Sequence, residues 1–98
     1  MLVKIHRSYR DVVAICDDDL LDKKFEEGER QIDLTGSFFK GEEKNEEEVE
    51  EVMRDFNTED ACFYIVGKNS CSIALKIGLV KEGGLIKIDN VPIALALL

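Results

Sequence analysis

The sequence predicts an α+β fold: a mainly antiparallel mixed sheet of about five or six strands, with two or three helices covering one face. Short apolar segments that alternate with polar residues or end at turn residues indicate strands. One segment instead has clear helical periodicity, and strands and helices follow one another without regular βαβ alternation. The 98 residues are 45% hydrophobic and 35% charged. We therefore expect one compact domain over residues 1–98.

The first third of the chain predicts a hairpin, a short helix and another strand. Residues 2–6 alternate apolar and polar side chains, and residues 11–16 form an apolar run, so both are expected to be strands joined by residues 7–10. Three consecutive aspartates before Leu20 predict a short helix over about 19–25 that ends before Gly28. Alternation over residues 30–35 indicates a third strand.

The middle of the chain predicts a loop followed by an amphipathic helix. Residues 36–44 have no period and are interpreted as a loop. Asn45 with Glu48 has capping-box spacing, which predicts a helix over about 46–56. Its apolar positions are Val49, Val52, Met53 and Phe56. The other helix face is almost entirely glutamate, so it is expected to face solvent.

The last third predicts a central strand, a helix and a terminal hairpin. Residues 61–66 form a continuous apolar run, as in a strand covered on both faces. Asn69 or Ser70 is expected to cap the next helix, and Gly78 to end it. The dipeptide at 89–90 predicts a hairpin between strands 85–88 and 91–97, with Pro92 near the start of the last strand.

The net charge of −8 is unevenly distributed. Nineteen of the 21 acidic residues lie between positions 11 and 60, whereas residues 1–10 contain three basic residues and no acidic one. Such a surface repels nucleic acid over most of its area. The first hairpin is therefore the one segment where contact with the phosphates of a nucleic acid such as RNA is expected to be feasible.

A candidate anion site follows the central strand. Gly67, Lys68, Asn69 and Ser70 lead into a helix N-terminus, where free N–H groups and the lysine could bind phosphate or carboxylate. The phosphate-loop motif is incomplete, because Asn69 stands at the hydroxyl position and Cys62 at the position of the first glycine. A tight turn with a capped helix is the alternative interpretation.

A candidate partner surface combines basic, aromatic and apolar residues. His6, Arg7, Tyr9 and Arg10 cluster with Lys4 at the first hairpin, where arginine can pair with anionic groups and tyrosine can stack. Phe38 and Phe39 stand side by side in the glycine-bounded loop, and residues 93–98 form an apolar tail. The alternative for the hairpin is that its basic residues only balance the acidic surface of the middle of the chain. The alternative for the loop and the tail is burial in the core.

No complete catalytic or metal-binding set is visible. His6 is the single histidine, and the three cysteines lack paired spacing, so a zinc site is not expected. Cys16, Cys62 and Cys71 are expected to be buried free thiols. Adjacent aspartates at 17–19 would point to opposite faces of a strand, which favours helix capping over Mg²⁺ binding. We expect no catalytic residue, metal or cofactor.

The chain resembles the archaeal family known as domain of unknown function 424. The resemblance rests on the order and spacing of short motifs over nearly the whole length: residues 6–7, 13–17 with 20–21, 38–42, 65–67 and 91–92. Departures from the family pattern occur at Asp22, Lys40, Tyr64 and Ile93. The resemblance implies an archaeal, cytoplasmic protein with a housekeeping role near translation, and it carries no established activity.

Three functions remain open at this point. The leading hypothesis is a non-enzymatic binding or adaptor domain for a protein or ribonucleoprotein partner. We expect it to be cytoplasmic, since no apolar run is long enough to span a membrane. The second is a protein or enzyme that binds a small anionic ligand at residues 67–70. The third is a homodimer joined through the C-terminal strand.

Overall fold

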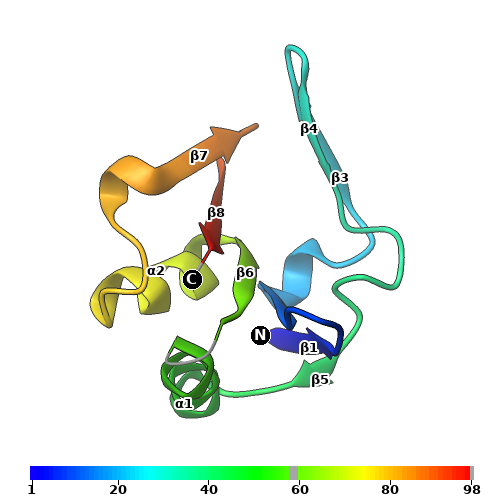
Figure 1. Ribbon diagram of the computed structural model, residues 1–98. Coiled ribbons are helices and arrows are strands. Elements are labelled where there is room, and N and C mark those ends of the chain that lie inside the picture. Colours follow the sequence, from blue (N-terminus) through cyan, green and yellow to red (C-terminus); the bar gives the residue numbers. More distant parts are fainter. Residues whose placement is uncertain (58–59, 98) are drawn as a thin grey trace.

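The computed structural model describes residues 1–57 and 60–97, and its centre is a six-stranded sheet (Figure 1). The strand order is β5-β1-β2-β6-β8-β7. These strands are β1 (Leu2–His6), β2 (Val12–Cys16), β5 (Glu42–Glu43), β6 (Cys62–Val66), β7 (Leu85–Ile88) and β8 (Val91–Leu97). Neighbours pair antiparallel except β2 with β6, which are parallel. The predicted α+β fold with a mainly antiparallel mixed sheet is confirmed.

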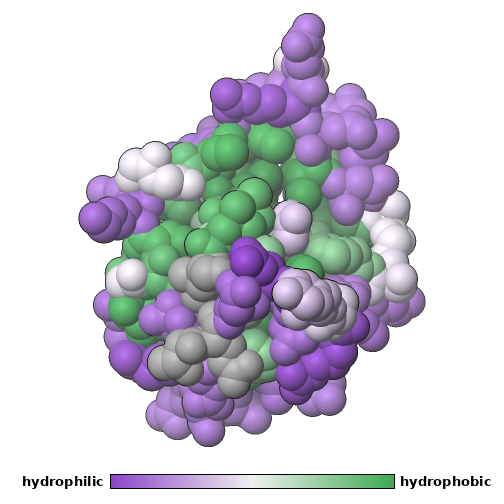
Figure 2. Space-filling view, in the orientation of Figure 1, coloured by the Kyte–Doolittle hydropathy of each residue, from purple (hydrophilic) through white to green (hydrophobic). Residues whose placement is uncertain are grey.

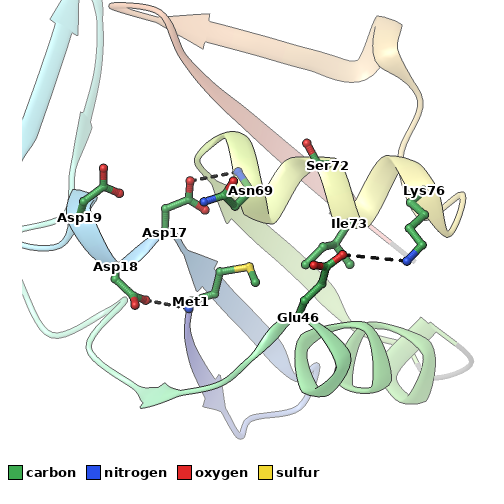
Figure 3. A pocket seen from close by; sticks show the side chains of 9 residues that line it. All are labelled: Met1, Asp17, Asp18, Asp19, Glu46, Asn69, Ser72, Ile73 and Lys76. Atoms are coloured by element: carbon green, nitrogen blue, oxygen red, sulfur yellow. Dashed lines mark hydrogen bonds and ion pairs between the residues drawn. The ribbon is translucent and has the colours of Figure 1, made fainter.

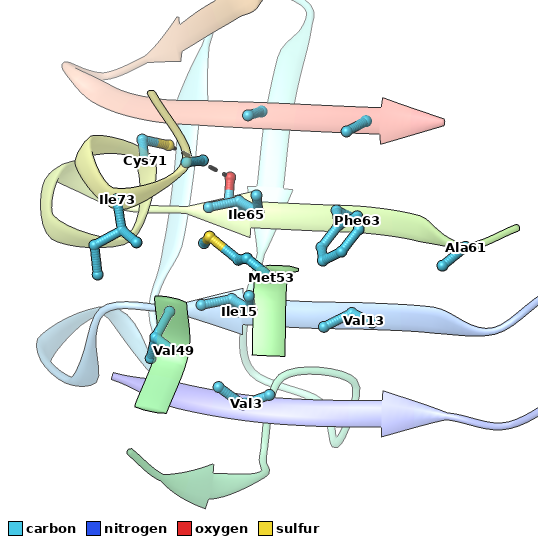
Figure 4. Packing of buried hydrophobic residues seen from close by; sticks show 13 residues of the cluster. Val3, Val13, Ile15, Val49, Met53, Ala61, Phe63, Ile65, Cys71 and Ile73 are labelled. Carbon is cyan, nitrogen blue, oxygen red and sulfur yellow. Dashed lines mark hydrogen bonds between the residues drawn. The ribbon is translucent and has the colours of Figure 1, made fainter. Parts of the chain in front are cut away.

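Both α-helices cover the same face of this sheet, as predicted. They are α1 (Glu46–Asn57) and α2 (Lys68–Lys76). Alternate residues of the strands, among them Val13 and Ile15 of β2 and Phe63 of β6, pack against Val49 and Met53 of α1 (Figure 4). All five side chains are fully buried. No helix in the described part of the chain is long and apolar enough to cross a membrane.

The α1 helix begins with the predicted capping box. The Asn45 side-chain oxygen accepts a hydrogen bond from the Glu48 N–H at 2.8 Å, and the Glu48 carboxylate accepts one from the Asn45 N–H at 3.0 Å. Two N–H groups at the helix start are thereby satisfied by side chains. The local sequence alone specifies this helix terminus.

The predicted helix over 19–25 is wrong. The chain forms one turn of 3₁₀ helix, η1 (Asp18–Leu20), and then the hairpin of β3 (Lys24–Glu27) and β4 (Arg30–Asp33). Gly28, with φ +63°, lies at the hairpin turn, and Phe25 pairs with Ile32. Both side chains pack into a second core, which lies on the sheet face opposite the helices. Burial in the tertiary structure therefore outweighs the weak local preference for a helix.

The β3–β4 hairpin and the loop before β5 cover part of the second sheet face. Leu34 and Phe39 are buried there against Ala14, Cys16 and Val66 of the central strands. The predicted loop over 36–44 also contributes the two-residue strand β5, which pairs only with Leu2 and Val3. Consequently the second face is covered by two small elements, whereas the first is covered by two helices.

The C-terminal third forms as predicted except at the start of α2. Asp89 and Asn90 both have positive φ in the β7–β8 turn, as a two-residue hairpin requires. Gly78, with φ +79°, follows the end of α2, and η2 (Glu82–Gly84) precedes β7. However, α2 begins at Lys68 after Gly67, so neither Asn69 nor Ser70 is its N-cap.

Replacing Gly41 should destabilise the fold. A Cβ at this position would lie 2.0 Å from the Val3 carbonyl oxygen, because the loop passes directly against β1. We expect Gly41→Ala to lower the free energy of unfolding by at least about 2 kcal/mol, since backbone must shift to relieve the clash. Urea denaturation measures this change.

Gly36→Ala is the matched control, because a Cβ on Gly36 meets no atom within 4 Å. It should change the free energy of unfolding by less than about 0.5 kcal/mol. Equal stability of the two variants would contradict the close approach of the loop to β1.

Candidate interaction surface

The strand register places a set of apolar side chains on the sheet face opposite the helices. Paired residues point to the same face, so one row across the sheet contains His6, Val12, Cys62 and Leu97. The next row contains Lys4, Ala14, Tyr64 and Leu95. The third row is the one that the hairpin covers, and it ends at Ile86 on β7. Of the first two rows, Ala14 is buried beneath Leu34 and Phe39, whereas Tyr64, Leu95 and Leu97 lie beyond this cover.

Five large apolar side chains remain substantially exposed on this side of the sheet. Their exposed fractions are 39% for Phe38, 38% for Tyr64, 47% for Ile86, 51% for Leu95 and 65% for Leu97. We call the surface formed by these five residues the open face. Figure 2 shows hydrophobic side chains gathered over the β7–β8 region and toward the β3–β4 hairpin.

Two ring contacts and one hydrogen bond fix the aromatic part of the open face. The Phe38 ring stacks on the imidazole of His6 with centroids 4.5 Å apart, and it meets Tyr64 edge-on at 5.4 Å. The Phe38 carbonyl oxygen lies 2.9 Å from Nε2 of His6. The loop residue Phe38 is therefore held against β1 and β6, so this part of the surface is preformed.

Phe39 lies elsewhere, although it is adjacent in sequence. Its side chain is 3% exposed and packs in the second core, with its ring edge-on to Phe38 at 5.1 Å. It anchors the loop and is not available to a partner. One phenylalanine of the pair is thus on the surface and the other is in the core.

The charged residues of the first hairpin are engaged within the chain. Arg7 pairs with Asp11 at 2.8 Å and lies over the Phe56 ring at 5.5 Å from its centroid. Arg10 pairs with Asp60 at 3.0 Å. These pairs are mostly solvent-exposed and contribute little to stability. The contact with Phe56 of α1 nevertheless places the Arg7 guanidinium on the helix side of the sheet, away from the open face.

Tyr9 is fully exposed at the tip of the same hairpin. The tip follows His6, whose row of the sheet ends in Leu97. Tyr9 therefore lies beyond the end of the sheet at which His6 and Leu97 stand. Of the six residues predicted for partner binding, the structure brings His6 and Phe38 together and places Tyr9 beyond them.

The candidate anion site at Gly67–Ser70 is filled by a side chain of the protein itself. The Asp17 carboxylate accepts hydrogen bonds from the N–H groups of Asn69 and Ser70 at 3.0 and 2.9 Å, and from the Ser70 hydroxyl at 2.7 Å. Asp17 is 6% exposed. A carboxylate thus occupies the place at the helix N-terminus where a bound anion would lie.

The three aspartates at 17–19 have different environments (Figure 3). Asp17 points toward α2, whereas Asp18 pairs with the Met1 ammonium at 2.8 Å. This ammonium holds the pKa of Asp18 below its usual range. Asp19 is exposed and lines a hollow of about 560 Å³ together with Glu46, Ser72 and Lys76. Within residues 1–57 and 60–97, no three His, Cys, Asp or Glu side chains form a metal-binding group.

Two of the three free thiols are deeply buried. Burial, together with the negative charge of Asp17, raises the pKa of Cys16 to about 11 and that of Cys71 to about 12. Because the thiolate is the reactive form, both are poor nucleophiles near neutral pH. Cys62 is only half-buried and lies in the row between Val12 and Leu97.

The sequence interpretation missed part of the open face. The apolar tail was identified, and its alternation over VPIALAL is the signal that puts Leu95 and Leu97 on one face; Leu98 lies outside the described residues. Tyr64 was missed because it belongs to a continuous apolar run, which predicts burial on both faces of its strand. Ile86 was not singled out either, although it is exposed in β7. The part of this sheet face that stays exposed depends on how far the β3–β4 hairpin extends over it.

The comparisons with known proteins agree with this fold. Residues 6–97 match the family model described as "Protein of unknown function (DUF424)". The chain belongs to this family. A crystal structure of an uncharacterized conserved protein from the archaeon Methanopyrus kandleri matches this DUF424 chain with a TM-score of 0.77 and 23% identity. The match covers 96% of this chain and 87% of that chain, and it shows a shared fold. No curated protein matches the sequence.

Removing the Asp17 carboxylate should destabilise the protein. Asp17→Ala deletes three hydrogen bonds and leaves the buried Ser70 N–H and hydroxyl without their acceptor. We expect a loss of about 2–3 kcal/mol in the free energy of unfolding, measured by urea denaturation. Asp19→Ala is the control, with an expected change below about 0.5 kcal/mol because Asp19 is exposed. Equal effects would rule out the proposed cap.

The buried thiols should reduce stability at alkaline pH. Their pKa values lie above the ordinary 9.0, which means that the folded state favours the protonated thiols. The resulting stabilisation is complete below about pH 9 and is lost as pH rises toward 11. Each thiol should contribute a slope of about 1.4 kcal/mol per pH unit in that range. The double variant Cys16→Ala, Cys71→Ala should show a flatter decline in chemical denaturation between pH 9 and pH 11. An unchanged slope would contradict burial of the thiols.

Proposed function

We propose that this DUF424 protein is a non-enzymatic binding domain that holds a protein partner on its open face. One observation carries the proposal: five large apolar side chains are 38–65% exposed on one side of the sheet. Monomeric proteins seldom expose contiguous apolar patches of several hundred Å² unless the patch is used for binding. The open face groups five such exposed side chains on one side of the sheet.

The size of the open face suits a docking surface. It extends from the Phe38–His6 stack at β1 to Ile86 on β7, across five strands of the main sheet. Adjacent strands lie about 4.8 Å apart, so the surface is roughly 20 Å wide. A standard protein interface buries about 800 Å² on each partner, which a surface of this width can supply together with its rim.

The composition of the surface favours a protein over RNA. Leu95, Leu97 and Ile86 make up the part over β7 and β8, and aliphatic side chains bury against apolar partners. RNA-binding sheets instead rely on aromatic rings that stack on bases, together with a basic surround. With a net charge of −8, the chain as a whole repels phosphate. A ribonucleoprotein partner would therefore contact this surface through its protein component.

Three groups that could support chemistry are already used in the fold. Asp17 caps α2, and the thiols of Cys16 and Cys71 are buried with raised pKa values. The turn at Gly67–Ser70, which carried the small-ligand alternative, has its N–H groups bonded to Asp17. These observations support binding rather than catalysis as the role of the domain.

Affinity capture from an archaeal lysate tests the proposal. The tagged full chain should retain specific proteins that Leu95→Ser, Leu97→Ser loses, because those two leucines supply the most exposed part of the open face. Since both side chains are at least half exposed, the double variant should remain within about 1 kcal/mol of the wild-type stability. Mass spectrometry of the eluted proteins is the measurement.

The matched control changes the opposite side of the molecule. Glu47→Ala, Glu51→Ala alters two exposed residues of α1, which lies on the covered face of the sheet. This variant should retain the same proteins as wild type. The proposal fails if wild type captures nothing specific, or if the leucine variant captures the same proteins as the control.

A further inference from the structure

We infer that the partner segment held on the open face is apolar with a carboxylate-bearing flank, and that Lys4 and Lys40 receive this flank. The inference rests on the proposed function and specifies its partner. It starts from the order of side chains across the sheet. The β7–β8 side is aliphatic, the centre is aromatic with Tyr64 and Phe38, and the β1 side carries a cationic residue, Lys4.

Lys4 and Lys40 have no ion-pair partner within the described residues. Both line a hollow of about 570 Å³ beside β1, together with Val3, Ile5 and Val52. The third lysine there, Lys44, lies 3.6 Å from Glu42, the single carboxylate of the lining. The hollow therefore has a net positive charge, although the chain carries −8.

The sheet edge at this position has no strand paired with it. β5 pairs with Leu2 and Val3 only, so from Lys4 to His6 the edge of β1 that faces away from β2 is bordered by the loop of Phe38 and Gly41 instead of a strand. A partner segment that crosses the open face from β7 toward β1 thus reaches a sheet edge where two ammonium groups have no ion-pair partner among the described residues. A carboxylate placed there would gain charge-assisted hydrogen bonds.

The surrounding charge would set the orientation of the segment. Lys4 and Lys40 attract carboxylates, whereas the acidic residues of α1, whose Val52 also lines the hollow, repel them. Charges at an interface rim contribute mainly to specificity and association rate. The apolar residues would provide affinity, and the two lysines would determine which way the segment lies.

A second copy of this chain fits the surface less well. The side chains that the register places in the two open rows include no carboxylate. Two copies that met through these rows would therefore offer Lys4 no acidic partner from the same rows. Single-stranded RNA would satisfy the lysines but would find no stacking surface at Ile86, Leu95 and Leu97.

Peptide selection against the full chain tests the inference. A phage library of random peptides would be panned against wild type, against Lys4→Glu, Lys40→Glu and against Lys68→Glu, Lys81→Glu. The last variant makes the same charge change at two exposed lysines outside the open face and the hollow. Wild type and this control should select apolar peptides with Asp or Glu on one flank.

Charge reversal should change the selected sequences. The Lys4→Glu, Lys40→Glu variant should select Lys or Arg on the flank, and a peptide selected on wild type should bind it about tenfold more weakly in fluorescence polarisation, as expected for two rim charges. The Leu95→Ser, Leu97→Ser variant should lose the selected peptides altogether. Both results together would support the inference.

The contrary outcomes are separable. Peptides that need the leucines but show no acidic bias, or whose bias survives charge reversal, would overturn the inference and leave the proposed function standing. Failure to select any leucine-dependent peptide would overturn both. A dimer in light scattering that the leucine variant abolishes would identify a second copy as the occupant. Binding of a single-stranded RNA oligonucleotide at physiological salt that needs Lys4 and Tyr64 would identify RNA instead.

Discussion

The parallel pairing of β2 with β6 joins the two halves of the chain, and the rest of the structure depends on it. The ladder continues beyond the strands, where the Asp17 N–H donates to the Val66 carbonyl oxygen at 3.1 Å. The Asp17 side chain then holds the first N–H groups of α2. Gly67 is needed here because a Cβ would lie 2.3 Å from the Asp17 carboxylate carbon. Asp17 thus follows the end of β2, caps the start of α2 and fixes the position of the helix relative to the strand.

The sheet that results has unequal cover on its two faces. Both helices pack on one face, where the larger core forms around Val13, Ile15 and Phe63. On the other face, a two-stranded hairpin and a short loop shield the row nearest η1 and Ala14 in the next row, and they leave Tyr64, Leu95 and Leu97 exposed. Burial of apolar surface stabilises a fold wherever it occurs. The apolar side chains left outside this cover do not gain this stabilisation, and this asymmetry motivates the proposed function.

Local sequence was sufficient where a signal lies within one turn or one pair of residues. The Asn45–Glu48 capping box, the Asp89-Asn90 hairpin turn and the glycine after α2 all formed as expected. Local sequence was insufficient where the interacting residue is distant in the chain. Residues 19–25 carry a weak helix pattern, yet Phe25 pairs with Ile32 across a hairpin. Similarly, the cap of α2 comes from Asp17, more than fifty residues earlier, and no local pattern can reveal it.

The sequence by itself determined the fold class, the α1 helix, the charge segregation and the apolar alternation of the C-terminal strand. These depend on composition and on periods of two or 3.6 residues, which the chain carries whether or not it is folded. The tertiary structure decided which apolar residues stay exposed. Phe38 and Phe39 are neighbours of the same type, but one packs in the core and the other stacks on His6 at the surface. Exposure depends on where the hairpin and loop end on the sheet, and that position is set by contacts between residues far apart in the chain.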